Sequence, residues 1–540
     1  MTFAAPARER RPSTDVARGR PEDRAGGSSA ARFVADARYG GTAMGEDIDR
    51  ERFGPADFHR FRRRLADGLT ALGELLARPG FGEGPASVGA ELEMALIDDS
   101  GRPAGNNAEI RDAVAGAQVA LEVGRFSIET ETPPFDLAGR PFSAIADSMR
   151  DAATRIDTAA RGFGARVAMV GTLPTLTLAD LGPGGLTASA RYRALEAGLD
   201  ALKGDHTIAI SGRERLEVEL PGIVAEAANA AFQVHLKVAP ADFARTLNAA
   251  QIATGPVLAV AGNSPTFLGQ VLWEETRVPV FHQSVDGVDR AHDSWRPDRV
   301  SFGHGWVRSG ALELFAESVA LHPALLPLSS AEEPLAALAG GGVPELNELR
   351  LHHGTTWRWN RAVFDPSDGG HVRIEFRALP SGPSIADMAA NAAFLVGLTL
   401  ALADEEWMLN AVPFRCVRRN FFEAARRGMD AELLWPDSTP PSPQPETAPA
   451  LVEHLVDMAR RALVAAGVDH DEADTHLEPI RRRTATGVTG SSWQREAIEA
   501  AERRGAMRGR ALATMLDAYL EASASGEPIH SWPSPAAVVA

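Results

Sequence analysis

The sequence is poor in the residues on which several familiar kinds of site depend. Cys416 is the only cysteine, which excludes an intrachain disulfide and a cysteine-ligated metal site. Lys203 and Lys237 are the only lysines, and neither stands in the Gly-Lys-Ser/Thr setting of a P-loop. The motifs GxGxxG, HExxH and GxSxG are also absent. Any nucleotide site must therefore use another architecture.

Basic charge is also scarce, because 55 Lys and Arg residues stand against 72 Asp and Glu, for a net charge of −17. This balance argues against nucleic acid as a partner, although a local metal or arginine cluster can still attract an anionic substrate. The composition, 44% hydrophobic and 24% charged, is ordinary for a soluble protein. We find no apolar run of spanning length and no secretory signal at Met1. We therefore expect a cytoplasmic protein without a membrane partner.

The segment Leu121–Pro134 (LEVGRFSIETETPP) contains three carboxylates, Glu122, Glu129 and Glu131. In it Glu129 and Glu131 alternate with apolar residues, which predicts a β-strand that sends both carboxylates to one face. Glu122 has the opposite parity, so its convergence with Glu129 requires a bulge or kink, for which Gly124 is the natural place.

Other segments show the same alternation of apolar and chemically capable residues. Ser87–Ile97, Phe232–Val238 and Val372–Ala378 are each predicted to be strands with one apolar face. Their polar faces carry Glu91 and Glu93, His235, and the trio Arg373, Glu375 and Arg377. Placed side by side, these strands would present carboxylates for Mg²⁺ and guanidinium groups for phosphate on one face.

Each strand taken alone allows a plainer interpretation. The carboxylates could belong to a solvated sheet face, and His235 could be a hydrogen-bonded histidine at a sheet edge. Arg373, Glu375 and Arg377 could form an ion-pair ladder of little energetic worth. The recurrence of the pattern on several strands favours a shared site, of the kind that phosphoryl transfer requires.

Composition and periodicity also predict the organisation of the chain. We expect a disordered arm over residues 1–54 and a catalytic domain over residues 55–434. A proline-rich hinge (435–450), helices that complete the domain (451–525) and a loose tail (526–540) follow. Among the expected helices are Phe58–Leu76, Ile385–Ala403 and a single helix over Trp493–Ala522.

The motifs in these segments resemble, in order, those of the bacterial glutamate–cysteine ligase family, also called carboxylate–amine ligases. They are GxExE at Gly89–Glu93, ExGRFxIE at Glu122–Glu129, QVHL at Gln233–Leu236, NSPxFxG at Asn263–Gly269, ETRxPxF at Glu275–Phe281, GTxxRWNR at Gly354–Arg361 and RxExRxLPxGP at Arg373–Pro383. Each motif is weak alone, but the ordered series is specific and runs from about Phe58 to about Trp493.

The resemblance implies an α+β, glutamine synthetase-like fold, in which helices pack outside a curved antiparallel sheet. It also implies a reaction in which ATP phosphorylates the γ-carboxylate of glutamate and the amine of cysteine then displaces phosphate. ATP and Mg²⁺ are the implied co-substrate and cofactor, and the implied partners are small molecules.

Site residues follow from the resemblance position by position. The implied ligands of Mg²⁺, or their immediate partners, are Glu91, Glu93, Glu122, Glu129, His235 and Glu375. Arg377 would steady the transferring phosphoryl group, and with Glu129 it is the residue on which we expect catalysis to depend most. Arg277 would hold a carboxylate of glutamate. The other implied substrate- or nucleotide-binding residues are Gln233, Asn263, Trp357, Arg358, Asn360 and Arg373.

Three alternatives to a glutamate–cysteine ligase stay open. The acceptor could be another amine, because the pocket for cysteine is not legible from the sequence. Within the same fold the reaction could instead phosphorylate a guanidino compound. The chain could also be a non-catalytic, nucleotide-binding relative.

Overall fold

A computed structural model describes residues 48, 50–115, 118–202, 207–220, 222–285, 297–436 and 442–539. Its centre is an antiparallel sheet of eight strands, as expected. The main path runs β11 (Asn360–Asp365), β12 (His371–Phe376), β8 (Phe232–Val238), β1 (Ser87–Ile97), β3 (Ser127–Glu131) and β2 (Val119–Leu121). The short strands β4 (Phe135–Asp136) and β5 (Arg166–Ala168) also pair with β1.

Alternation decides which face of this sheet is buried against helices. Leu92 and Met94 of β1, Val234 of β8, and Ile374 and Phe376 of β12 are all completely buried. Their neighbours along each strand point to the opposite face, because successive side chains of a strand alternate. The polar residues singled out in the sequence therefore share that opposite face.

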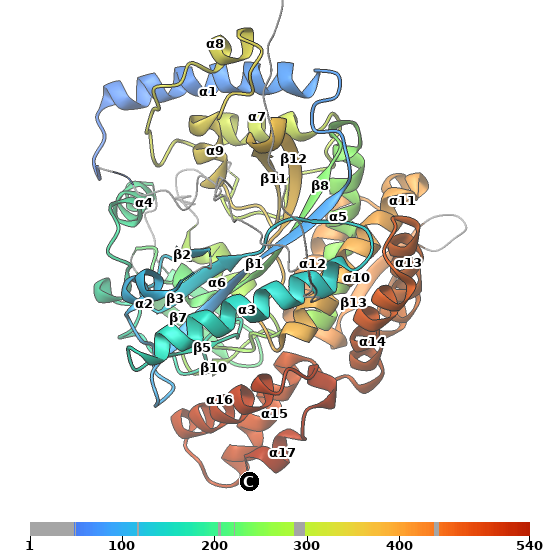
Figure 1. Cartoon of the computed structure of the whole chain (residues 1–540). Coiled ribbons are helices and arrows are strands. Elements are labelled where there is room, and N and C mark those ends of the chain that lie inside the picture. Colours follow the sequence, from blue (N-terminus) through green and yellow to red (C-terminus); the bar gives the residue numbers. More distant parts are fainter. Residues whose placement is uncertain are drawn as a thin grey trace, which may run out of the picture. The chain divides into compact units, whose positions relative to one another are not determined.

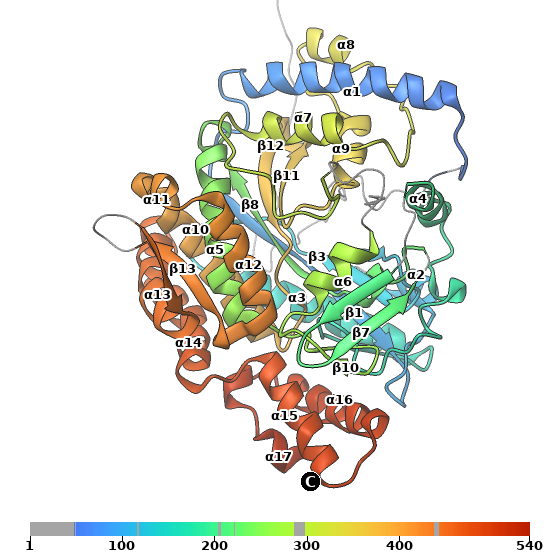
Figure 2. The same ribbon diagram turned by 180° about the vertical axis from the view of Figure 1, so that it is seen from behind.

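Helices surround the sheet (Figure 1, Figure 2). Those before β11 are α1 (Pro55–Leu76), α2 (Asn107–Ala113), α3 (Pro141–Arg161), α4 (Ala190–Asp200), α5 (Phe243–Ala261), α6 (Arg277–Ser284), α7 (Ala311–Leu321), α8 (Pro334–Ala339) and α9 (Asn347–Gly354). Those after β12 are α10 (Ile385–Ala403), α11 (Glu406–Ala411), α12 (Phe414–Arg427), α13 (Ala448–Ala465), α14 (His470–Thr486), α15 (Gly490–Arg503), α16 (Arg508–Ala524) and α17 (Pro535–Val538). Three hairpins lie outside the sheet: β6 (Thr207–Ser211) with β7 (Arg215–Glu219), β9 (Thr266–Phe267) with β10 (Gln270–Val271), and β13 (Glu432–Pro436) with β14 (Pro443–Thr447).

The helix α10 is deeply packed, since it contacts α3, α5, α13 and α14. By length and composition it is apolar enough to cross a membrane, which the sequence reading did not anticipate. However, 83% of the most apolar 18-residue stretch of this helix is buried inside the fold. The apolar character of α10 is thus accounted for by core packing.

Several boundary predictions are corrected by the structure. The expected hinge over residues 435–450 contains the β13–β14 pairing and the start of α13; residues 437–441 lie outside the described part of the chain. The single helix expected over Trp493–Ala522 is two helices, which part where Gly505 adopts a φ of 92°. The expected loose tail buries Ile529 and Trp532 and forms α17. The predicted arm lies almost wholly outside the described residues.

Candidate active site

The register of the central strands aligns the polar residues into rows. Glu93 lies opposite Glu129, and Glu91 lies opposite Glu131, across the β1–β3 pair. On the other side, Glu375 of β12 lies opposite His235 of β8. The strands predicted separately from alternation are therefore neighbours, and their polar side chains converge.

A cavity opens over this face and encloses about 1060 Å³, including space open to solvent. Its polar lining comprises Glu91, Glu93, Glu122, Glu129, Glu131, Arg191, Tyr192, Glu226, Gln233, Thr355, Arg361, Glu375 and Arg377. Its apolar lining includes Leu121, Val123, Leu195, Ile223, Val285, Leu326 and Trp357. Anionic and cationic groups thus share one hollow with an apolar wall.

Glu122 reaches the cavity by a turn and not by the expected bulge. The chain reverses between β2 and β3, so that Ala120 lies opposite Glu129. The Asn107 amide nitrogen holds this turn by donating to the carbonyls of Gly124 and Ser127, each at 3.1 Å. In an antiparallel hairpin, an even-numbered residue of one strand can lie opposite an odd-numbered residue of the other, as Ala120 and Glu129 do. The alternation within a single strand does not predict this.

Three ligand-type residues meet beside the cavity, whose lining includes Glu91 and Glu375 but neither His235 nor Arg373. Glu91, His235 and Glu375 offer atoms that all lie within 4.8 Å of one another. His235 Nε2 is 3.0 Å from Glu91 Oε1 and 4.0 Å from Glu375 Oε1. Behind the ring, Arg373 Nε donates to His235 Nδ1 at 2.8 Å. In neutral His235 the ring proton is therefore assigned to Nε2, which faces the carboxylates.

Two arginines bracket Glu375. Arg361 is bidentate, with Nε and Nη2 donating to the two Glu375 oxygens at 2.6 and 2.8 Å. Arg377 Nη1 donates to Gln233 Oε1 at 2.5 Å and lies 3.4 Å from Glu375 Oε2. Gln233 in turn donates to Glu93 Oε1 at 2.9 Å. The planar fork of Arg377 is thus held in place at the edge of the carboxylate cluster.

The pKa values record how closely the carboxylates are crowded. Burial raises the pKa of Glu93 to about 7, with Glu122 as the next largest cause. Burial and the nearby Glu91 and Glu122 raise the pKa of Glu129 well above its usual range. Burial acts on Glu375 in the same direction, but Arg361 and Arg377 outweigh it and lower the pKa of Glu375. The cavity therefore holds more negative charge than its arginines offset.

The donor set fits a hard divalent cation. The carboxyl groups of Glu122 and Glu129 interact, and after burial and Glu91 this interaction is among the causes that raise the pKa of Glu129. Such a pair needs either a shared proton or a cation between its oxygens. His235 Nε2 is buried without a hydrogen-bond partner of good geometry among the described residues. To act as a ligand through Nε2, His235 would need the tautomer with its proton on Nδ1, the atom that Arg373 now contacts, whereas the carboxylates fit as they stand.

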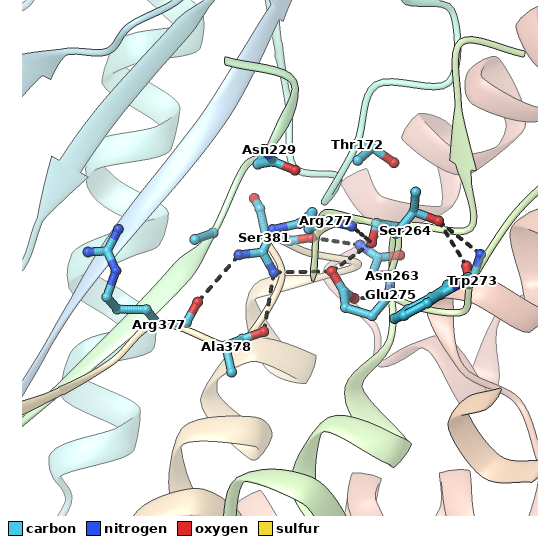
Figure 3. Close-up of polar contacts among 12 residues, drawn as sticks. Thr172, Asn229, Asn263, Ser264, Trp273, Glu275, Arg277, Arg377, Ala378 and Ser381 are labelled. Carbon is cyan, nitrogen blue, oxygen red and sulfur yellow. Dashed lines mark hydrogen bonds and ion pairs between the residues drawn. The ribbon is translucent and has the colours of Figure 1, made fainter. Parts of the chain in front are cut away.

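Arg277 does not line the cavity. It lies in a buried network in which Arg277 Nη1 donates to Glu275 Oε1 at 3.1 Å and to the carbonyl of Ala378 at 3.2 Å (Figure 3). Its Nη2 donates to the carbonyl of Arg377 at 3.4 Å. Arg277 and Glu275 are almost completely buried. The described geometry therefore gives Arg277 a hold on the backbone at the end of β12 and no access to a substrate carboxylate.

Asn263 belongs to the same network, since its amide nitrogen donates to the carbonyl of Ser381 at 2.7 Å (Figure 3). Arg358 pairs with Glu317 at 2.5 Å, and the Asn360 amide donates to Thr254 at 2.9 Å. Arg358 and Asn360 do not line the cavity, although both were expected there. Trp357 does line it.

Six polar lining residues are missing from the predicted set, namely Glu131, Thr355, Arg361, Arg191, Tyr192 and Glu226. Arg361 stands in the GTxxRWNR segment, where its pairing with Glu375 becomes visible only once β11 lies beside β12. Arg191 and Tyr192 come from the first turn of α4, and Glu226 begins a short 3₁₀ turn, Glu226–Ala228. None of these last three lies on a strand, so alternation gives no signal for them.

Comparison with known proteins places these observations in a family. Residues 87–514 match the sequence profile of glutamate-cysteine ligase family 2. A glutamate–cysteine ligase from Francisella tularensis, solved in complex with AMP, has 13% identity, a TM-score of 0.49, and alignment over 85% of this chain and 91% of that chain. A bifunctional glutathione synthetase from Pasteurella multocida has 11% identity and a TM-score of 0.44, and the alignment covers 85% of this chain and 53% of the synthetase chain. Among curated proteins no sequence matches.

Proposed function

The chain belongs to glutamate-cysteine ligase family 2, and from this premise we propose that it joins the γ-carboxylate of glutamate to the amine of cysteine. The reaction would consume ATP, require Mg²⁺ and pass through γ-glutamyl phosphate. Family membership supports the coarser statement, an ATP-dependent carboxylate–amine ligase. We expect it to act in the cytoplasm, where a reducing environment keeps a cysteine substrate in its thiol form.

The observation that carries the proposal is the convergence of Glu91, Glu93, Glu129 and Glu375 with Arg377 in one cavity. A Mg²⁺ ion held there would supply positive charge to offset that of the triphosphate. Glu91, Glu93, Glu122, Glu129 and Glu375 would hold this ion, with His235 as a further ligand in the tautomer that carries its ring proton on Nδ1.

Arg377 and Arg361, two arginines that line the cavity, would have different roles. Arg377 is held by Gln233 at the edge of the carboxylate cluster, so its fork can meet the charge that develops on the transferring phosphoryl group. Arg361 is fully engaged with Glu375 and would orient that carboxylate without touching substrate. The apolar lining would exclude water, which competes with the amine for an acyl phosphate.

The test is phosphate release by the purified protein with ATP, Mg²⁺, glutamate and cysteine. We expect release only when both amino acids are present, together with a product that has the mass of the amide. Turnover with glutamate and a different amine, but not with cysteine, would retain the ligase and change the acceptor. A phosphorylated guanidino product without an amide, or the absence of Mg·ATP binding by calorimetry, would overturn the proposal.

A further inference from the structure

Glu226 is a carboxylate at the cavity whose role the predicted ligand set does not cover. It lines the cavity and is partly exposed there. Among the described residues, its carboxylate has no hydrogen bond or ion pair. Burial, followed by Glu122 and Glu93, raises the pKa of Glu226 well above its usual value. A carboxylate in these surroundings calls for a cationic partner that the described residues do not supply.

Close packing fixes the place of Glu226 relative to the carboxylate cluster. Gly124, in the turn that follows Glu122, approaches the 3₁₀ turn so closely that a Cβ there would lie 2.6 Å from Ala227 Cβ. Ser127 Oγ also donates to the carbonyl of Ala227 at 3.3 Å. Glu226 is therefore set beside Glu122, on a backbone that leaves little room to move.

Arg191, on α4, lines the same cavity as Glu226. The next residue, Tyr192, donates its hydroxyl to the carbonyl of Leu121 at 2.6 Å, which ties the first turn of α4 to the residue before Glu122. The charges of Arg191 and Glu226 are both among the causes that shift the pKa of Tyr192. Arg191 is itself buried. One guanidinium and one carboxylate thus line the cavity that the Tyr192 phenol also lines.

A guanidinium and a carboxylate that line one cavity are together complementary to the head group of an α-amino acid, which carries a carboxylate and an ammonium group on one carbon. We propose that Arg191 binds the α-carboxylate, and Glu226 the α-ammonium group, of the donor glutamate. This inference rests on the proposed function and adds to it the residues that recognise the donor.

The position of the pair favours the donor over the acceptor. The reacting γ-carboxylate must lie beside Arg377, and Arg377 is also among the charges that act on Glu226. A short methylene chain separates the two ends of glutamate, so a head group near Glu226 is compatible with a γ-carboxylate near Arg377. Arg277, which the family resemblance assigns to a glutamate carboxylate, is engaged by Glu275 and two backbone carbonyls.

The test compares three donors, with hydroxylamine as a small acceptor that needs no pocket of its own. Glutarate lacks the α-ammonium group, and γ-aminobutyrate lacks the α-carboxylate. The wild type should prefer glutamate over either analogue by about 10- to 100-fold in kcat/KM, the worth of one charged hydrogen bond. Glu226→Gln should lose the preference over glutarate and keep that over γ-aminobutyrate. Arg191→Gln should do the reverse.

The matched controls are Arg215→Gln and Glu217→Gln, which alter an exposed ion pair on β7 and should leave both preferences unchanged. If Arg191→Gln does not fold, Arg191→Lys and the wild-type preferences still test the pair. Unaltered preferences in both site variants, or a change confined to the Mg²⁺ requirement in Glu226→Gln, would overturn the inference. Failure of the wild type to release phosphate with glutamate and any amine would overturn the proposed function. Calorimetric binding of glutamate and glutarate would then decide the head-group assignment independently.

Discussion

Glu93 and Glu129 lie directly opposite each other across the β1–β3 pair, and both line the same cavity. Like charges placed in this way destabilise a sheet when no cation lies between them. Crowding at the site is therefore a cost to the fold, and a divalent cation relieves it. Loss of stability in return for a binding site is common where function requires buried charge.

Replacing one of these glutamates by glutamine removes a carboxylate and keeps the shape of the side chain, so its effects on turnover and on stability can be measured separately. We expect Glu129→Gln to lower ligase turnover by at least about 100-fold, because an amide replaces a charged metal ligand. Its melting temperature without Mg²⁺ should hold or rise, since one member of a repelling cluster is gone. Phosphate release and thermal unfolding measure the two effects. Glu217→Gln, which changes an exposed carboxylate on β7, is the control, and near-normal turnover in Glu129→Gln would count against the metal assignment.

Arg377 should be sensitive even to lysine. Its Nη1 is fixed by Gln233, and a lysine would offer a point charge in place of the planar fork. We expect Arg377→Lys to lower kcat by roughly 100- to 1000-fold with a smaller change in the KM for ATP. Steady-state kinetics at saturating Mg²⁺ provide the measurement. A variant with full kcat would show that Arg377 has only a structural role.

Two buried histidines should make the protein sensitive to mild acid. Burial is the main cause that lowers the pKa of His352 from 6.5 to about 4, and that of His322 from 6.5 to about 3. Because the unfolded chain binds these protons at higher pH than the folded chain, the two histidines contribute a fall in the free energy of unfolding as pH drops from about 6.5 towards 4. The raised pKa values of Glu93 and Glu129 contribute in the opposite direction, so the histidine contribution is read as the difference between wild type and variant. Urea unfolding across this range measures the slope. His352→Gln should make it shallower, and an identical slope in this variant would exclude His352 as a contributor.

A buried ion pair ties the C-terminal helices to the core. Arg483 of α14 and Asp387 of α10 are both almost fully buried, with Arg483 Nε 3.7 Å from Asp387 Oδ1. Arg483→Leu should lower the free energy of unfolding by about 3–5 kcal/mol, because Asp387 is left buried without its partner. The control is Arg460→Leu at the more exposed Arg460–Asp474 pair, which should cost less than about 1 kcal/mol. Equal losses in the two variants would contradict this account.

How far the sequence predicts this site depends on the element that carries each residue. Glu91, Gln233 and Glu375 were predictable because each lies on a strand with a regular apolar face, and their strands prove to be neighbours. Glu122 was predicted with the wrong geometry, because alternation does not distinguish a bulge from a hairpin. Arg191 and Glu226 lie on a helix turn and a 3₁₀ turn, where only tertiary packing brings them to the cavity.

The same limit explains the errors outside the site. Proline-rich residues 435–450 suggested a hinge, but Pro443 and Pro445 are accommodated on a two-stranded hairpin whose edges are free. The apolar spacing continues through Gly505, so the break between α15 and α16 depends on a backbone conformation that periodicity does not record. Local pattern thus predicted which elements exist, and less reliably where they end.

The most direct test follows the oxygen that the mechanism moves. If the γ-carboxylate attacks the terminal phosphoryl group of ATP, one of its oxygens leaves with phosphate when the amine displaces the acyl phosphate. Glutamate labelled with heavy oxygen in the γ-carboxylate, incubated with ATP, Mg²⁺ and cysteine or hydroxylamine, should therefore yield phosphate that carries one labelled oxygen. Phosphate released at the same rate without the label would contradict the account.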